Sequence, residues 1–130
     1  MTSVVLDASA FIALLRREPG MDVVHKHLSK AIISAVNYSE VLKKTIERGG
    51  SPEPVDAYVR SVSLTVVPFD AEHAMSSAQL FLLTKPHGLS FADRACLALG
   101  VRSKMDVLTT DQKMAKVKLS VKVILIRGHH

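Results

Sequence analysis

Five acidic residues stand where an apolar run gives way to a more polar stretch: Asp7, Glu40, Asp70, Asp93 and Asp111. Carboxylates within about 4 Å of one another repel, so a cluster is stable only when a proton or a cation lies between them. Oxygen ligands select Mg²⁺ or Mn²⁺, which keep part of their water and bind substrate phosphates. Such an ion activates water for phosphodiester hydrolysis. The residue types therefore indicate a metal-dependent phosphate enzyme.

Two of these acids also fit the spacing of a helix-capping motif. Asn37 stands three residues before Glu40, and Ser90 stands three residues before Asp93. In a capping box the first side chain accepts from the backbone at the start of the helix, and the acid accepts from the backbone of the first residue. Each acid is explained by capping when it is considered alone.

The remaining acids divide in the same way. Asp70 and Asp111 are suited to be N-caps, where a carboxylate accepts from free backbone N–H groups and favours the helix dipole. Asp7 differs, because an acid that closes an apolar strand is costly to bury. The residue types alone leave open which of the five acids bind an ion.

Short apolar runs alternate along the chain with longer stretches of helical periodicity. The runs predict strands over 4–6, 31–33, 64–67, 107–109 and 121–126. Helices are expected over 10–17, 21–30, 37–48, 53–62, 71–84, 91–103 and from Gln112. Because such strands are joined by long crossovers, we predict an α/β fold, a three-layer α/β/α sandwich around a mainly parallel five-stranded sheet. Ligands bind at the carboxyl ends of the strands in such sheets, where these acids fall.

The composition and length suit one domain, which we expect to span residues 1–127 of the 130. His129 and His130 are expected to be a tag remnant. The longest uncharged run, 73–84, is too short to span a membrane, and no basic segment precedes an apolar one at the N-terminus. The single cysteine, Cys96, forms no internal disulfide and is expected in the core. These features predict a cytoplasmic protein.

The charge is unevenly distributed. The chain has 17 Lys and Arg against 12 Asp and Glu, a net charge of +5. Residues 1–111 hold all 12 acids and 12 of the basic residues, so the excess is in the five that follow: Lys113, Lys116, Lys118, Lys122 and Arg127. A basic end of this kind either contacts a phosphate backbone or forms a solvated face.

Other catalytic signatures are missing from the sequence. It has no phosphate-binding Gly-x-x-x-x-Gly-Lys loop, no Gly-x-Gly-x-x-Gly fingerprint and no Gly-x-Ser-x-Gly elbow. His25 and His27 are two residues apart and point to different sides of a helix, which argues against a zinc site.

Four segments resemble the PIN-domain family, and within it the VapC-type toxin ribonucleases of prokaryotic toxin–antitoxin pairs. They are VVLDASAF at 4–11, SAVNYSEV at 34–41, LSFADRACLAL at 89–99 and VLTTD at 107–111. The resemblance implies the α/β/α sandwich and four acids that hold Mg²⁺ or Mn²⁺ for RNA cleavage. Carried over motif by motif, these catalytic and metal-binding acids are Asp7, Glu40, Asp93 and Asp111. Asp70 matches no family motif, which leaves it as a helix cap.

The resemblance also implies supporting residues. Ser9 matches a small polar residue beside the metal site, and either Thr109 or Thr110 plays a similar part near Asp111; we include Thr110 in the predicted site. Asn37 is expected to orient Glu40 while capping its helix. Arg94 either contacts substrate phosphate or pairs with a neighbouring acid. Met114 stands where family members often place a large aromatic residue, a departure that affects local packing.

The hypothesis is that metal-activated water cleaves RNA, leaving a 5′-phosphate and a 3′-hydroxyl. Asp7, Glu40 and Asp93 would position one metal, and Asp111 would complete the site or help a second ion bind. The resemblance implies a homodimer and a small antitoxin as partners. The apolar stretch 80–83 has more hydrophobic residues than one buried stripe requires, and is either a contact face or ordinary core.

Two alternatives stay open. The first is a PIN-fold module that binds RNA or a partner without catalysis. The second is a phospho-acceptor signalling domain, which needs an acid pair after the first strand and a lysine at the end of the fifth. Asp7 has no acidic neighbour, and Lys122 precedes most of its strand, so this alternative fits less well.

Overall fold

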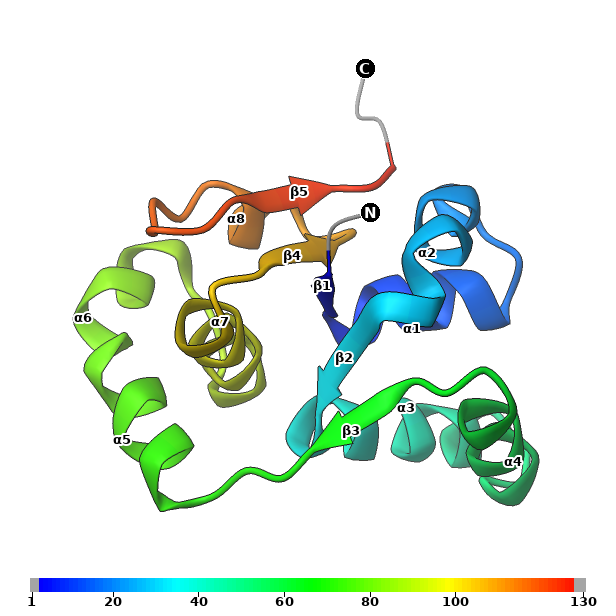
Figure 1. The fold of residues 1–130 in the computed structure, drawn as a ribbon. Coiled ribbons are helices and arrows are strands. Elements are labelled where there is room, and N and C mark those ends of the chain that lie inside the picture. Colours follow the sequence, from blue (N-terminus) through cyan, green and yellow to red (C-terminus); the bar gives the residue numbers. More distant parts are fainter. Residues whose placement is uncertain (1–2, 128–130) are drawn as a thin grey trace.

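A parallel sheet forms the centre of the molecule (Figure 1). The computed structural model describes residues 3–127. Within them the strands are β1 (Val4–Leu6), β2 (Ala31–Ser34), β3 (Thr65–Val67), β4 (Asp106–Thr109) and β5 (Val123–Leu125). They form one five-stranded sheet in the order β3-β2-β1-β4-β5, and every neighbouring pair is parallel. The predicted α/β fold with its five-stranded sheet is confirmed.

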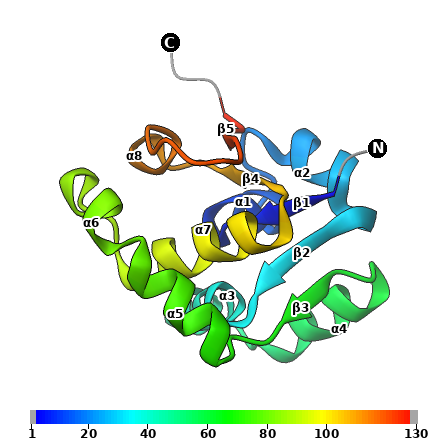
Figure 2. The ribbon, with the colours of Figure 1, turned by 60° about the vertical axis from the view of Figure 1, so that its left-hand side comes forward.

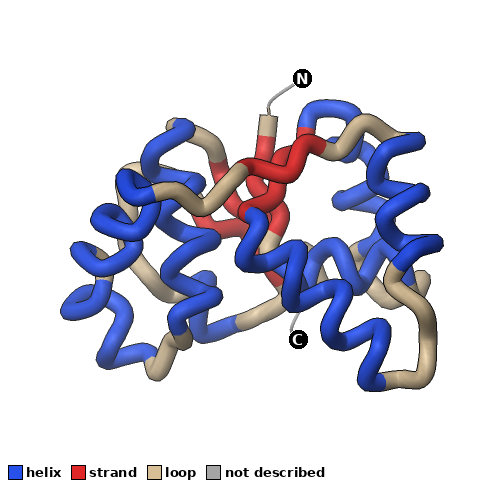
Figure 3. The backbone as a smooth tube through the Cα atoms, turned by 90° about the horizontal axis from the view of Figure 1, so that it is seen from below, coloured by secondary structure: helices blue, strands red, loops and turns tan. Residues whose placement is uncertain are grey.

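Helices connect the strands and surround the sheet (Figure 3). The described α-helices are α1 (Ala8–Leu15), α2 (Met21–His27), α3 (Ala35–Glu47), α4 (Glu53–Ser61), α5 (Ala71–Gln79), α6 (Phe81–Thr84), α7 (Phe91–Ser103) and α8 (Gln112–Ala115). Two short 3₁₀ turns, η1 (Leu28–Lys30) and η2 (Lys85–His87), follow α2 and α6. None of the helices in residues 3–127 is both long and apolar enough to cross a bilayer.

The strands bury side chains on both faces of the sheet. Val4 and Leu6 pack in a cluster with Phe11 of α1, whereas Val5 between them packs in a second cluster with Leu97 of α7. Successive side chains of a strand point to opposite faces, so each face needs its own layer of helices. The continuous apolar character of the strands is explained by this double cover. In Figures 1 and 2, α5 and α6 lie beside α7, on the side of the sheet away from α1 and α2.

A glycine allows α7 to approach β4 closely. A Cβ atom added at Gly100 would lie 2.6 Å from the Cγ2 atom of Val107. No side chain of even one carbon fits there without displacement of the strand or the helix. This contact, together with buried Cys96 and Leu97, fixes α7 on the sheet and so determines where its first turn lies.

The structure corrects several predicted boundaries. The helix expected over 10–17 covers Ala8–Leu15 and so begins directly after Asp7. The helix expected over 71–84 is divided, because α5 ends at Gln79 and α6 begins at Phe81. The last strand covers Val123–Leu125, a shorter range than 121–126. The helix expected from residue 37 begins at Ala35, directly after β2. The predicted tag remnant at 128–130 lies outside the described residues.

Candidate metal and nucleic-acid site

Three of the predicted acids act on one another at the carboxyl edge of the sheet. Asp7 follows β1 directly, Glu40 lies in the second turn of the helix that follows β2, and Asp93 lies in the first turn of α7. Burial is the main cause of the raised pKa of Asp7 and of Glu40. The charge of Asp93 adds to it at Asp7, and the charges of Asp7 and Asp93 add to it at Glu40. Segments that are far apart in the sequence therefore bring three like charges together.

Asp7 is the best-held member of this group. Its side chain is buried, and its Oδ2 atom accepts hydrogen bonds from the hydroxyls of Ser9 at 2.7 Å and Thr109 at 2.9 Å. Its backbone N–H donates to the carbonyl of Leu108 at 3.0 Å, which ties the end of β1 to β4. The carboxylate is held in one orientation at the sheet edge.

Backbone groups after β4 support the two hydroxyls. The N–H of Thr110 donates to Ser9 Oγ at 3.0 Å, and the N–H of Asp111 donates to Thr109 Oγ1 at 3.0 Å. Thr110, included in the predicted site, thus contributes its backbone, whereas the hydroxyl beside Asp7 is that of Thr109. Each hydroxyl accepts from the backbone and donates to Asp7.

Burial sets the electrostatic state of the acids. Removal from water raises the pKa of Asp7, and the hydrogen bonds from Ser9 and Thr109 offset only part of this effect. Burial is also the largest cause of the raised pKa of Glu40. The Lys44 ammonium acts in the opposite direction on Glu40. The site holds more negative charge than its own protein cations neutralise.

Lys44 was not among the predicted site residues. It stands four residues after Glu40 on α3, and this glutamate-to-lysine spacing brings two side chains together on a helix surface. This spacing is the feature of the sequence from which Lys44 could have been predicted as a neighbour of Glu40. Its long flexible side chain supplies a mobile counter-charge at the border of the acidic group.

Asp93 and Asp111 combine a place at the sheet edge with helix capping. Ser90 and Asp93 form the predicted capping box, with Asp93 N donating to Ser90 Oγ at 3.2 Å and Ser90 N donating to Asp93 Oδ2 at 2.8 Å. Asp111 caps α8 by accepting from the N–H of Lys113 at 2.9 Å. One oxygen of each carboxylate is occupied by capping, which leaves the other oxygen without such a bond.

Asn37 does not cap α3, so that prediction is wrong. Ser34, the last residue of β2, is the N-cap, and its hydroxyl accepts from the N–H of Val36 at 3.2 Å. Asn37 therefore lies inside the helix, fully buried, and its amide donates to the carbonyl of Ala92 at 3.0 Å. This bond joins α3 to the first turn of α7, and the same amide lowers the pKa of Glu40. Asn37 thus links the elements that carry two of the acids.

Arg94 forms no salt bridge within the described residues. Its guanidinium lies over the ring of Phe81 at 5.4 Å, and its buried Nε atom has no hydrogen-bond partner in residues 3–127. Cation–π contact accounts for its position. Of the two predicted explanations, pairing with a neighbouring acid is not observed.

Two other predicted assignments are confirmed. Asp70 caps α5 by accepting from the N–H of His73 at 2.9 Å. Cys96 is completely buried, and burial raises the pKa of its thiol. Met114 is also fully buried and fills the second core cluster.

The basic end divides into a paired and an unpaired part. Arg127 lies 3.4 Å from Glu18, so its charge is matched within the domain. Lys113, Lys116 and Lys118 are exposed on and after α8, which follows β4 at the same edge as the acids. Three cations therefore stand on the β4 side of the acidic group.

The donor chemistry fits a hard divalent cation. The described residues include no group of three or more His, Cys, Asp and Glu side chains close enough to hold an ion directly. Burial raises the pKa of Asp7 and of Glu40, the nearby acids raise both further, and within residues 3–127 Lys44 is the one cation that acts on Glu40. The side chains that contact the Asp7 carboxylate are the hydroxyls of Ser9 and Thr109. Mg²⁺ keeps several waters and needs only one or two direct carboxylates. The arrangement suits an ion held partly through water.

The PIN domain model matches residues 4–119 of the sequence. The chain belongs to the PIN-domain family. No curated protein sequence matches it.

Several solved structures share the fold. One of them is VapC20 from Mycobacterium tuberculosis, described as a Sarcin-Ricin loop cleaving toxin. Its TM-score with this chain is 0.72 at 17% sequence identity, and the match covers 92% of this chain and 99% of VapC20. DNA-bound VapBC from Salmonella typhimurium has a TM-score of 0.70 at 17% sequence identity. The match covers 95% of this chain and 98% of that chain. A toxin–antitoxin complex from Klebsiella pneumoniae has a TM-score of 0.70 at 16% sequence identity. The match covers 93% of this chain and 100% of that chain. The fold of this chain is that of VapC-type proteins.

Proposed function

We propose that this protein is a metal-dependent endoribonuclease and the toxin of a toxin–antitoxin pair. The observation that carries this proposal is the gathering of three carboxylates, Asp7, Glu40 and Asp93, at the carboxyl edge of the sheet, with Asp7 held by Ser9 and Thr109. Family membership and the VapC-type fold support it. Asp93 also caps α7, but the burial of Asp7 and the repulsion among the three carboxylates oppose the folded state.

In this proposal the acidic side chains position a metal ion and neutralise its charge, and other residues hold those side chains in place. Ser9 and Thr109 hold the Asp7 carboxylate by hydrogen bonds to one of its oxygens. Asp7, Glu40 and Asp93 would hold one Mg²⁺ or Mn²⁺, and Asp111 would complete the site or help to bind a second ion. When bound, the ion would lower the pKa of a water and neutralise the developing charge on the phosphate. Cleavage would leave a 5′-phosphate and a 3′-hydroxyl.

The direct test is cleavage of a structured RNA by the wild type, Asp7→Asn and Asp93→Asn, with Mg²⁺ and with EDTA. The wild type is expected to cleave only with the metal, and both variants are expected to be inactive. End analysis of the products checks for the 5′-phosphate. Equal activity in all three proteins, or cleavage that EDTA does not change, would overturn the assignment.

A PIN-fold module that binds RNA without cleaving it is the second candidate. It is favoured by the absence of a closed ligand group in the described part of the chain. Such a module would bind the same RNA with and without Mg²⁺ and leave it intact. Denaturing gels of RNA after long incubation with Mg²⁺ or Mn²⁺ separate the two candidates.

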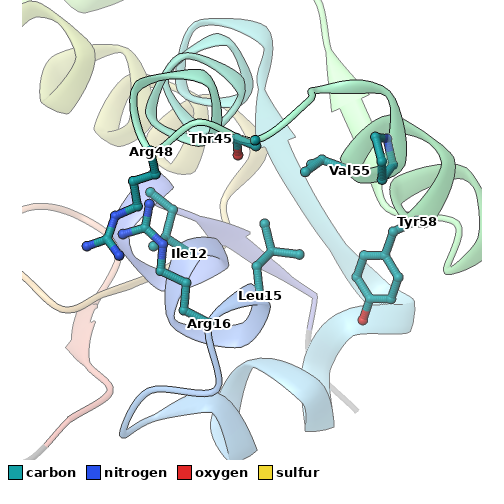
Figure 4. Close-up of a pocket in the computed structure, with 9 residues that line it drawn as sticks. Ile12, Leu15, Arg16, Thr45, Arg48, Val55 and Tyr58 are labelled. Carbon is teal, nitrogen blue, oxygen red and sulfur yellow. The ribbon is translucent and has the colours of Figure 1, made fainter.

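A cleft between α1, α3 and α4 supports the proposal of an antitoxin partner (Figure 4). Its volume is about 390 Å³, and its lining includes the apolar side chains of Ile12, Leu15 and Val55. Figure 4 shows Arg16 and Arg48 close together at one end of it. An amphipathic segment with an acidic residue beside its apolar face fits this combination. Arg48→Glu is expected to weaken binding of the antitoxin partner, in a titration against wild type.

A homodimer is the second proposed assembly. Three apolar side chains on consecutive helices are solvent-exposed: Met75 at 62%, Leu82 at 79% and Leu83 at 43%. Leu80, by contrast, packs against the second core cluster, so only the first residue of the stretch 80–83 is ordinary core. Exposed apolar groups of this size mark contact surfaces. Leu82→Lys is expected to shift the sedimentation coefficient to that of a monomer.

We place this activity in the cytoplasm. An RNA substrate is available there, and the one cysteine, buried Cys96, needs no oxidising compartment.

A further inference from the structure

Phe91 is exposed at the start of α7. It is the first residue of α7, its side chain is 51% accessible, and Asp93 follows it by two residues. Phenylalanine is only a moderate helix former, and helix starts favour proline or acidic residues. Nothing in the formation of α7 therefore accounts for a large ring at this position.

The ring is braced from one side. Phe69 meets it edge to face, with a centroid distance of 5.5 Å and an interplanar angle of 83°. His73 stacks on Phe69 at 6.4 Å and 25°, and its Nδ1 lies 3.0 Å from the carbonyl oxygen of Pro68. Because three rings support one another, the orientation of Phe91 is largely fixed before any ligand binds. A fixed ring loses little conformational entropy on binding.

Topology places this cluster at the same edge as the acids. Phe69 is the second residue after β3, and Asp7 is the first residue after β1. Only β2 lies between these two strands in the sheet. Two strand spacings amount to about 10 Å along the edge. Phe91 and Asp93 both lie in the first turn of α7, with their side chains on different sides of the helix. The aromatic cluster therefore adjoins the acidic group on the β3 side, opposite the lysines on the β4 side.

Cations accompany the rings. Arg94 lies on the same turn of α7, and its guanidinium and the Lys85 ammonium lie over Phe81 at 5.4 and 6.0 Å. Among residues 3–127 neither of these cations forms an ion pair with an acid. Aromatic rings beside uncommitted cations suit bases and phosphates together, whereas a purely protein-binding face does not need the charges.

We propose that Phe91, braced by Phe69, is a base-stacking subsite for an unpaired nucleotide of RNA beside the cleaved phosphate, and that Arg94 contacts the adjacent backbone. The inference rests on the proposed function, and it adds a requirement. The base next to the cleavage point must be free to leave its own stack, so single-stranded or loop RNA is bound and fully paired RNA is not.

Binding of a short oligouridylate in EDTA tests the subsite apart from cleavage, with a gel to show that the RNA stays intact. Phe91→Leu keeps an apolar side chain but removes the aromatic face, and it is expected to weaken binding about tenfold. The loss should be the same at low and high KCl. Arg94→Gln should also weaken binding, with a loss that shrinks as KCl rises. Ile46→Ala, which also trims an exposed apolar side chain near the end of α3, is the matched control and should bind as wild type.

A fluorescence signal reports stacking itself. The chain has no tryptophan, so Phe91→Trp introduces the only indole. Its emission is expected to be quenched severalfold by oligouridylate and unchanged by a paired RNA of the same length. The indole introduced by Ile46→Trp, also at an exposed apolar position, should not respond to either RNA.

The outcomes separate the subsite from the nuclease. Oligouridylate affinity of Phe91→Leu within twofold of wild type overturns the subsite, even if the protein cleaves RNA. A dimer-to-monomer shift of Phe91→Leu with unchanged RNA affinity also overturns it and assigns the ring to a contact between copies. Loss of RNA affinity in Phe91→Leu, together with no cleavage by wild type, supports the subsite and removes the nuclease.

Discussion

Asp7 and Asp56 are two carboxylates that accept hydrogen bonds from hydroxyls in opposite settings. Asp7 is buried at the sheet edge and accepts from Ser9 and Thr109, with other acids nearby. Asp56 lies on α4, accepts from the Tyr38 hydroxyl at 2.7 Å and pairs with the Arg60 guanidinium. Burial raises the pKa of Asp7, whereas Tyr38 and Arg60 lower the pKa of Asp56.

The difference lies in what balances the charge. The negative charge of Asp56 is balanced by the Arg60 guanidinium one helical turn away, so this carboxylate needs no ligand from outside the protein. At Asp7 no cation of the protein is among the causes that act on the carboxyl. The hydrogen-bond donor to Asp56, Tyr38, stays protonated, since burial and the Asp56 carboxylate raise the pKa of that phenol to about 12. The acidic edge is the region whose chemistry requires something from outside.

The largest expected effect is on cleavage. Asp7→Asn keeps the shape and hydrogen-bonding capacity of the side chain but removes its charge, and it should lower the rate of Mg²⁺-dependent RNA cleavage by about 10³-fold or more. Asp56→Asn is the same substitution in the balanced region and should cleave within twofold of wild type. Equal losses in the two variants would show that Asp7 acts through stability alone.

The second effect is on the pH dependence of unfolding without metal. A carboxyl whose pKa is raised by folding binds its proton more tightly in the folded state, so stability falls as pH rises. The window begins near the ordinary pKa values, 3.8 for Asp7 and 4.5 for Glu40, and ends above their raised folded-state pKa values. Glu40 is less buried than Asp7, so solvent screening reduces its share of this effect.

Urea unfolding in EDTA across this range is the measurement. The wild type should become less stable with rising pH, and Asp7→Asn should be flatter and more stable than wild type near neutrality. Addition of Mg²⁺ should restore stability at neutral pH in wild type only. A wild type that gains stability through this window would contradict the raised pKa values.

A smaller effect is expected from the hydroxyl that holds Asp7. Thr109→Val preserves the volume of this fully buried side chain but removes its hydrogen bond to the carboxylate. Loss of one such bond corresponds to about 1–3 kcal/mol, and we expect cleavage to fall about tenfold. Thr65→Val, at an exposed position of β3, makes the same chemical change and should leave the rate unchanged. A steady-state comparison of the two cleavage rates tests this role of Thr109, and equal rates would contradict it.

The smallest effect is on the thermal stability of the balanced region. Asp56→Ala and Tyr38→Phe should each lower Tm by no more than a few degrees, because the Asp56–Arg60 pair is exposed. The two losses should be less than additive in the double variant, since both changes remove the hydrogen bond from the Tyr38 hydroxyl to Asp56. Additive losses would show that Tyr38 and Asp56 stabilise the fold separately.

Local spacing and apolar pattern were enough to predict the sheet and part of the site. The β-branched runs are strands because both faces of the sheet are covered, and Ser90 with Asp93 forms the predicted capping box. Both features depend on residues that are near one another in the sequence. The family motifs then selected among the five acids, which the residue types could not do.

Tertiary context decided what the sequence left open. Ser34 and Asn37 both suit an N-cap, and Ser34 takes this role because β2 runs directly into α3. Which of Thr109 and Thr110 faces Asp7 depends on where β4 ends. The exposure of Leu82 depends on the break after α5, for which the 71–84 pattern contains no glycine or proline signal.

Titration with Mn²⁺ tests most directly the claim that the acidic edge is a divalent-cation site. Isothermal calorimetry of wild type, Asp7→Asn and Asp56→Asn compares the two regions in one experiment. Binding is predicted for wild type and Asp56→Asn with the same affinity, and its loss for Asp7→Asn. Equal Mn²⁺ affinity in all three proteins, or no binding by wild type, would contradict the account.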